Sequence, residues 1–252
     1  MKTGLTSVSF RKMSCDEVIK LAKEAKVDGI EWGSDVHVPQ GDVEYAKEVA
    51  KKTKNAGLEV ISYGSYFYLG ENDDFSPYVA SAKALGTECI RIWGGKKEKW
   101  QLSDEEYALL IDEARKVCSL AAEEGVTVSL EFHQHSITAN AIDAVQFIKD
   151  VSRDNLKLYW QEIIGRNFED NYADLQLVLP YLTNVHVFNY IEGKQELLFD
   201  GDAKARFCAY FKEVGKLSGE HAFMTEFTKG GLPENFIKDA EVLVAISKKP
   251  EI

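Results

Sequence analysis

Cysteine, long apolar runs and positive charge are all scarce in this sequence. Its four cysteines, Cys15, Cys89, Cys118 and Cys208, lie far apart and form no CxxC pair. This spacing argues against a zinc ribbon or a disulfide scaffold and indicates reduced thiols. No apolar run is long enough to span a bilayer, and MKTGLTSVSF lacks the apolar core of a signal peptide. These absences predict a cytoplasmic protein with no membrane partner.

The chain has fewer basic than acidic residues, and it has few histidines. The 252 residues include 30 Lys and Arg against 41 Asp and Glu, which gives a formal net charge of −11. Such an acidic chain repels phosphate backbones, so we expect no nucleic-acid partner. The chain has five histidines, which are few for an enzyme that holds three zinc ions through many His ligands.

One pattern is present eight times: a short apolar strand followed by a helix. The predicted strands cover residues 3–10, 29–33, 58–64, 89–95, 126–132, 156–161, 184–190 and 222–227. Eight such units at a spacing of about 30 residues predict a single (β/α)8 TIM barrel over residues 1–252. A doubly wound sheet would need a GxGxxG motif after the first strand, where the sequence reads SFRKMSC.

Polar side chains occur at the ends of four successive predicted strands. Glu131, Gln161, His186 and Glu226 stand among apolar neighbours at the ends of strands five to eight. In a TIM barrel all carboxyl-terminal strand ends meet at one mouth, where the active site lies. We therefore expect the four side chains to surround a common centre.

These four residues suggest the chemistry of a metal-dependent isomerase. Two carboxylates, an imidazole and an amide suit one divalent ion such as Mn²⁺, Zn²⁺, Mg²⁺ or Co²⁺. The ion would hold a hydroxyl and the neighbouring carbonyl of a sugar and acidify the C–H between them. Glu131 and Glu226 would remove and return that proton, which gives isomerisation or epimerisation through a cis-enediolate.

A second group of residues is predicted to contact the substrate. His133 lies on the same strand face as Glu131, and Arg91 is expected chiefly to pair with a carboxylate at the mouth. Aromatic residues at strand ends would wall a sugar pocket or pack in the core. Lys229 with the following glycines would seat an anion or form a plain turn. The candidate substrate-binding residues are His133, Arg91, Trp93, Tyr63, Trp32 and Lys229.

Five short motifs make the chain similar to a known family over essentially its whole length. They are GIEW, IRIWGG, LEFH, VHVFN and TEF on strands two, four, five, seven and eight. The chain resembles the sugar phosphate isomerase/epimerase family of xylose-isomerase-like barrels, which includes AP endonucleases, inosose dehydratases and ketose 3-epimerases. The resemblance implies one metal bound by Glu, Asp, His and Glu, with the two glutamates as the acid/base pair. Glu131, His186 and Glu226 match that pattern.

The chain departs from this family in places that leave other functions open. Gln161 stands where the family has aspartate, Ile164 replaces a histidine of the epimerases, and YIEGKQE contains no arginine. The first hypothesis is an isomerase or epimerase acting on a small sugar, sugar phosphate or polyol ketone. The alternatives are a lyase similar to inosose dehydratase and a non-catalytic sugar-binding barrel with a decayed metal site. An AP endonuclease is disfavoured. A homo-oligomer is compatible with the sequence.

Overall fold

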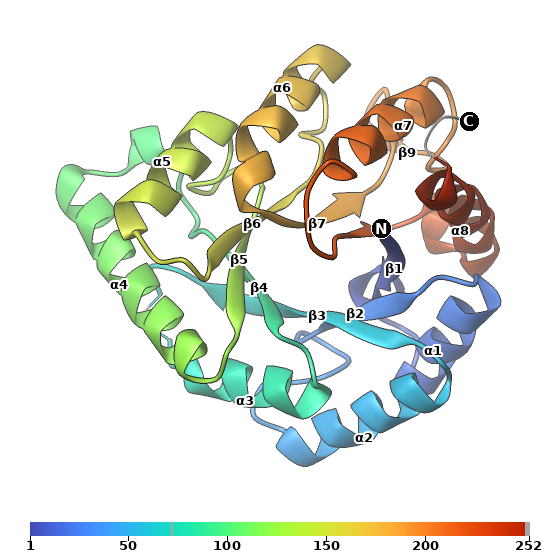
Figure 1. Ribbon diagram of the computed structural model, residues 1–252, viewed down its shortest axis with the longest axis horizontal. Coiled ribbons are helices and arrows are strands. Elements are labelled where there is room, and N and C mark those ends of the chain that lie inside the picture. Colours follow the sequence, from blue (N-terminus) through green and yellow to red (C-terminus); the bar gives the residue numbers. More distant parts are fainter. Residues whose placement is uncertain (72, 250–252) are drawn as a thin grey trace.

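The computed structural model describes residues 1–71 and 73–249 and has a closed parallel barrel at its centre (Figure 1). The strands follow the order β1-β10-β7-β6-β5-β4-β3-β2 around the barrel. The predicted TIM-barrel fold is therefore confirmed. The barrel strands are β1 (Lys2–Thr6), β2 (Gly29–Gly33), β3 (Glu59–Tyr68), β4 (Cys89–Trp93), β5 (Thr127–Glu131), β6 (Leu156–Trp160), β7 (Leu182–Val187) and β10 (Ala222–Thr225).

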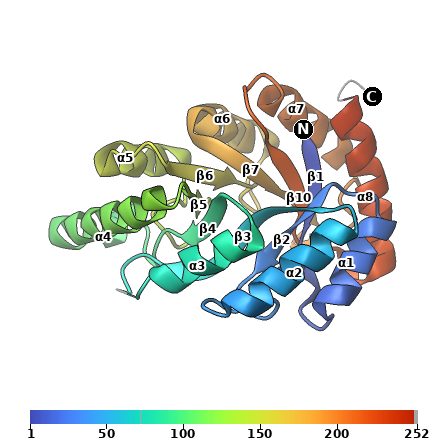
Figure 2. The same cartoon turned by 60° about the horizontal axis from the view of Figure 1, so that its bottom comes forward.

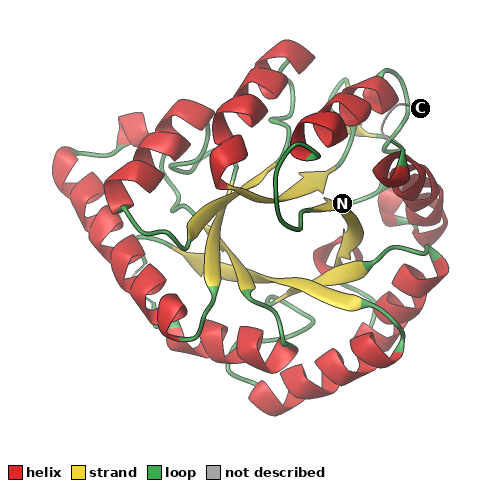
Figure 3. Ribbon diagram, in the orientation of Figure 1, coloured by secondary structure: helices red, strands yellow, loops and turns green. Residues whose placement is uncertain are grey.

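In the described part of the chain, eight α-helices form a ring around the strands (Figures 2 and 3). Ser14 with Glu17 and Ser103 with Glu106 form the capping boxes that begin α1 and α4, as their spacing predicts. Within the described residues no helix has the length and apolar character needed to cross a bilayer. The helices are α1 (Cys15–Glu24), α2 (Val43–Asn55), α3 (Ser76–Leu85), α4 (Asp104–Glu123), α5 (Ala141–Val151), α6 (Phe168–Val178), α7 (Ala203–Val214) and α8 (Pro233–Lys248).

Alternation along the strands separates an apolar outer layer from a more polar lumen. On β5, Val128 and Leu130 are fully buried in the core between strands and helices. Ser129 faces the lumen, where its hydroxyl accepts a hydrogen bond from Thr183. The same period of two brings Glu131, two residues on, to the lumen side at the end of the strand.

The ends of the first and third strands differ most from those predicted. The first strand ends at Thr6, and Ser7–Phe10 forms a 3₁₀ turn in which the Ser7 hydroxyl accepts the Gly33 N–H. The third strand continues past the predicted end at residue 64 to Tyr68. A short antiparallel pair, β8 (Tyr190–Ile191) and β9 (Lys194–Gln195), follows β7.

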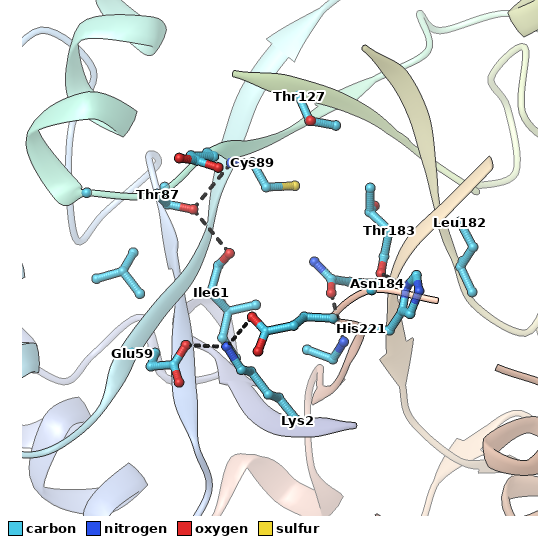
Figure 4. A pocket seen from close by; sticks show the side chains of 16 residues that line it. Lys2, Glu59, Ile61, Thr87, Cys89, Thr127, Leu182, Thr183, Asn184 and His221 are labelled. Carbon is cyan, nitrogen blue, oxygen red and sulfur yellow. Dashed lines mark hydrogen bonds and ion pairs between the residues drawn. The ribbon is translucent and has the colours of Figure 1, made fainter. Parts of the chain in front are cut away.

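A cavity of about 400 Å³ opens at the amino-terminal ends of the strands (Figure 4). Lys2, which pairs with Glu59 and Glu220, lies at its edge. Cys89 lines it from β4 and places its Sγ 3.9 Å from the hydroxyl of Tyr159 in the lumen. This cavity lies at the opposite end of the strands from the predicted site.

Candidate active site

Three of the predicted residues form a buried cluster at the carboxyl-terminal ends of β5, β7 and β10. One ligand atom from each of Glu131, His186 and Glu226 lies within 4.8 Å of the others. The exposed fractions of these residues are 2%, 1% and 7%. Two carboxylates and an imidazole withdrawn from water at one point need a partner that compensates their desolvation.

Gln161 follows β6 by one residue, and strand alternation directs its side chain to the lumen that holds this cluster. It has the same parity as Tyr159, whose ring centre is 5.0 Å from that of His186, so alternation turns Gln161 to the lumen. Its side chain is buried. The neighbouring Glu162 points the other way and accepts hydrogen bonds from Arg206 and Tyr210. Glu162 therefore does not replace the missing aspartate.

Glu31, in the middle of β2, also belongs to the site, although its role was not predicted. Its Oε1 lies 3.3 Å from Nε2 of His186, and its Oε2 accepts a 2.7 Å hydrogen bond from the Ser62 hydroxyl. Glu31 is 1% exposed. The signal in the sequence was a charged residue inside GIEWG, a short strand whose five residues are all buried.

Arg91 joins the carboxylates of Glu131 and Glu31. Its Nη1 lies 2.8 Å from Oε2 of Glu131, and its Nη2 lies 3.7 Å from Oε1 of Glu31. The guanidinium carbon also lies 5.7 Å and 5.4 Å from the ring centres of Tyr66 and Trp93. The expectation that Arg91 pairs with a carboxylate at the mouth is confirmed.

Burial disfavours the charged form of every titratable group in the cluster. The direction of each pKa shift depends on whether the neighbouring charges outweigh burial. Burial would raise the pKa of Glu31, but His186 and Arg91 outweigh it and lower this pKa to about 2. Burial would lower the pKa of His186, but Glu226 and Glu31 raise it to about 10. His186 outweighs burial at Glu226 and lowers its pKa. Burial outweighs Arg91 at Glu131 and raises its pKa, to which the charge of Glu226 adds.

The donor atoms fit a divalent metal ion. Among the described residues, Oε1 of Gln161 is buried without a hydrogen-bond partner. The two ring nitrogens of His186 also lack hydrogen-bond geometry, although Glu31 and Glu226 lie at ion-pair distances of 3.3 Å and 3.5 Å. Oε2 of Glu131 also lacks hydrogen-bond geometry, although Arg91 is at ion-pair distance. Buried polar atoms are rarely left in this state, and ligands aimed at an ion are one reason for it. Carboxylate, imidazole and amide donors suit Mn²⁺, Zn²⁺, Mg²⁺ or Co²⁺.

The backbone beside Glu226 is held in an unusual conformation. Phe227, the next residue, has a left-handed φ of 61°, which is costly for a residue with a side chain. Its N–H donates to the Ser9 hydroxyl at 2.8 Å. The hydroxyls of Ser9 and Thr6 lie 3.0 Å apart, and Thr6 donates to the carbonyl of Thr225. Hydroxyls of β1 and the following turn thus hold the backbone on both sides of Glu226.

Trp93 and His133 form part of the rim of the mouth. Their ring centres lie 4.8 Å apart in an edge-to-face arrangement, and Tyr68 stacks on Trp93 at 5.3 Å. Nδ1 of His133 lies 2.7 Å from the carbonyl of Gln134. Both residues are half-buried, and Trp93 borders Arg91, so they remain candidates for substrate contact.

Two other predicted substrate contacts, Trp32 and Tyr63, are corrected. Trp32 is fully buried and donates to Thr53 on α2, and Tyr63 is fully buried and donates to the carbonyl of Val38. Both rings lie in the layer between strands and helices, because their neighbours Glu31 and Ser62 occupy the lumen face. Lys229 is partly exposed and pairs with Glu196, and its predicted role in seating an anion stays a prediction.

The model of the xylose isomerase-like TIM barrel family matches residues 19–187. The chain belongs to this family. This match includes Glu131, Gln161 and His186 and ends before Glu226, which stands in TEF after β10.

Two kinds of named protein are similar to this member of the family. A 3-dehydroshikimate dehydratase of Bacillus anthracis is 24% identical over 201 residues, which are 75% of this chain and 72% of that protein. The crystal structure of a probable 3-DHS dehydratase from the same organism has a TM-score of 0.82 at 20% identity and covers 97% of this chain and 99% of that one. A D-psicose 3-epimerase of Clostridium cellulolyticum H10 has a TM-score of 0.75 at 13% identity over 98% of each chain.

Proposed function

We propose that this protein is a metal-dependent isomerase or epimerase of a small sugar, sugar phosphate or polyol ketone. The observation that carries the proposal is the buried cluster of Glu131, His186 and Glu226 at the mouth of the barrel. The proposal that the protein is an enzyme is supported by its similarity to proteins named as dehydratases and epimerases. Their shared requirement is the removal of a proton next to a carbonyl, which both reaction types need.

Glu131, Gln161, His186 and Glu226 would hold one divalent ion. When bound, the ion polarises a substrate carbonyl and so acidifies the neighbouring C–H group. Gln161 would contribute an oxygen without charge, so the affinity depends on the remaining carboxylates and on the imidazole. His186 must lose its proton to serve as a ligand.

Glu131 and Glu226 would act as the acid and the base. They come from β5 and β10, which are separated in the barrel by β6 and β7, so they approach the cluster from different sides. Their pKa values move in opposite directions, with that of Glu226 lowered and that of Glu131 raised. The lowered pKa of Glu226 suits the base that takes up the substrate proton. Arg91, beside Glu131, would stabilise negative charge that develops on the substrate oxygen.

A lyase that expels water is the second candidate, and the dehydratase relatives favour it. The first step is the same removal of a proton next to a carbonyl. The reactions diverge when a hydroxyl leaves instead of the proton returning. Half-buried His133, on the rim beside Trp93, is a candidate proton donor for that hydroxyl.

The first test measures the metal content of protein prepared without chelator, and then incubates it in D₂O with ketoses, inososes and 3-dehydroshikimate. We expect about one divalent ion per chain. An isomerase or epimerase gives a deuterated isomer, and a dehydratase gives a product that absorbs ultraviolet light through its new conjugated double bond. No bound ion after incubation with Mn²⁺ or Zn²⁺ would overturn the metal-dependent proposal and favour the non-catalytic sugar-binding barrel.

The proposal includes a small-molecule partner, a cytoplasmic location and no nucleic-acid partner. The acidic balance of −11 supports the last of these, because phosphate backbones would be repelled. A homo-oligomer is compatible with this function.

A further inference from the structure

We propose that Glu31 is a positioning residue that fixes His186 as a metal ligand through Nδ1 and replaces the negative charge missing at Gln161. This inference rests on the metal site of the proposed function. Glu31 is the carboxylate of the GIEW motif. The resemblance assigns it no role at the metal, so the role is argued from the contacts of Glu31 itself.

The two nitrogens of the His186 ring face two different carboxylates. Nε2 lies 3.3 Å from Oε1 of Glu31, and Nδ1 lies 3.5 Å from Oε2 of Glu226. Glu226 belongs to the three-residue cluster, so Nδ1 is the nitrogen that faces the ligand centre. A carboxylate on the other nitrogen fixes the tautomer and the orientation of the ring and makes it a stronger ligand.

Glu31 is itself held tightly in this place. Ser62 donates to its Oε2, and the guanidinium of Arg91 lies near its Oε1. The absence of a side chain at Gly64 leaves room for the Glu31 carboxylate, because a Cβ at position 64 would lie 2.7 Å from Oε1 of Glu31. The Glu31 carboxylate therefore has a hydrogen-bond donor, a nearby cation and the space it needs, and these contacts hold it in one position in the lumen.

The charge of Glu31 suits the site as well as its position does. Glu131 and Glu226 alone supply two negative charges, and Arg91 takes up one of them through its contact with Glu131. Glu31 adds a third carboxylate to the buried group, so with a neutral imidazole the group carries two net negative charges. That charge matches a divalent cation, although Gln161 contributes none.

The test is the affinity for Mn²⁺, measured by equilibrium dialysis without substrate. We expect Glu31→Gln to weaken Mn²⁺ binding by about 10- to 100-fold, the usual effect of removing a partner of a ligating histidine. Glu162→Gln is the matched control. It also removes a buried carboxylate paired with an arginine, Arg206, but one outside the lumen, and we expect its affinity to stay within about twofold of the native value.

A rescue separates positioning from a general loss of structure. Adding Gln161→Asp to Glu31→Gln restores a negative charge to the site, and we expect it to recover much of the Mn²⁺ affinity. If Glu31→Gln does not fold, Ser62→Ala removes the hydrogen bond that holds Glu31 and should weaken Mn²⁺ binding by a few fold.

The outcomes distinguish this inference from the proposed function. Native protein that binds no Mn²⁺ or other divalent ion would overturn both. Native protein that binds Mn²⁺, with a Glu31→Gln variant that binds it equally well, would overturn only the role of Glu31. A loss of affinity that Gln161→Asp does not recover would overturn the charge argument.

Discussion

Glu226 is the residue on which the proposed chemistry depends most directly. Its carboxylate is buried, kept ionised by His186 and held in place by the backbone at Phe227. Glu226→Gln keeps the shape of the side chain but removes its capacity to take up a proton. We expect turnover to fall by about 10²- to 10⁴-fold, the range for a lost general base. The far-ultraviolet circular dichroism spectrum should not change, and a fully active variant would exclude Glu226 as the base.

The position of single residues shows what the sequence could and could not predict. Glu131, His186 and Glu226 were found because each interrupts an apolar strand at its end, and parallel strands bring those ends together. Glu31 was missed because its partners lie on β3, β4 and β7, far from it in the sequence. Trp32 was misplaced because one residue of shift reverses the face of a strand, and Glu31 takes the lumen side.

The end of β10 depends on hydroxyls contributed by the other end of the chain. Ser9→Ala removes the acceptor of the Phe227 N–H and leaves that donor unpaired next to Glu226. We expect a loss of about 1–3 kcal/mol in the free energy of unfolding in urea, and a fall in kcat larger than the change in KM. Ser247→Ala is the control, because its hydroxyl donates to the carbonyl of Val244 within α8. Equal kcat in native and Ser9→Ala protein would contradict the role of this contact.

The buried carboxyl of Asp239 links helix α8 to the loop before α7 by a hydrogen bond and has a raised pKa. Asp239 is 3% exposed and accepts hydrogen bonds from the Leu198 N–H and the Thr228 hydroxyl. Burial outweighs these hydrogen bonds and raises its pKa to about 6. A carboxyl that holds its proton more tightly in the folded state stabilises the protein at low pH. This contribution is lost as pH rises from about 4 to about 6.

The variant Asp239→Asn tests this dependence. The amide oxygen can accept from Leu198, and the amide nitrogen can donate to the Thr228 hydroxyl. We expect the free energy of unfolding of the variant, relative to the native protein, to rise by about 1–3 kcal/mol between pH 4 and pH 7. Chemical denaturation at several pH values measures it. A difference that does not change with pH would contradict the raised pKa.

Elements were predicted best where local signals mark both of their ends. Capping boxes begin α1 and α4, and Gly86 in a left-handed conformation ends α3, and each of these signals can be read from neighbouring residues of the sequence. The first strand was predicted too long, because Ser7–Phe10 has alternating residues. Its serine hydroxyls instead accept the N–H groups of Gly33 at the end of β2 and of Phe227, which follows β10. Such contacts across the barrel leave no local pattern in the sequence.

At the scale of the whole molecule, metal binding should stabilise the barrel, since four strands contribute to one site. An ion that binds only the folded state at 100 times its Kd adds about 2.7 kcal/mol to the free energy of unfolding. For a chain of this size we expect Tm to rise by about 5–10 °C with Mn²⁺ and to return to its starting value with a chelator. His186→Ala should show no such rise. An equal rise in that variant would place the ion elsewhere.

The closed barrel was predictable because eight repeats leave few alternatives for burying parallel strands, and the structure agrees. The position of the mouth could therefore be predicted from the sequence, whereas the contacts among the side chains inside it could not. The pairing of Arg91 with two carboxylates needed the actual radius of the barrel, which decides which lumen side chains touch.

The cavity at the amino-terminal ends of the strands offers a second route into the barrel lumen, from the end opposite the mouth. Cys89 lines that cavity and reaches the hydroxyl of Tyr159, whose ring touches His186. Burial raises the pKa of its thiol to about 11, so alkaline conditions are needed for alkylation. A small fluorinated reagent attached there would place a nuclear magnetic resonance reporter below the cluster, where a paramagnetic ion broadens its signal while the mouth stays open to substrate.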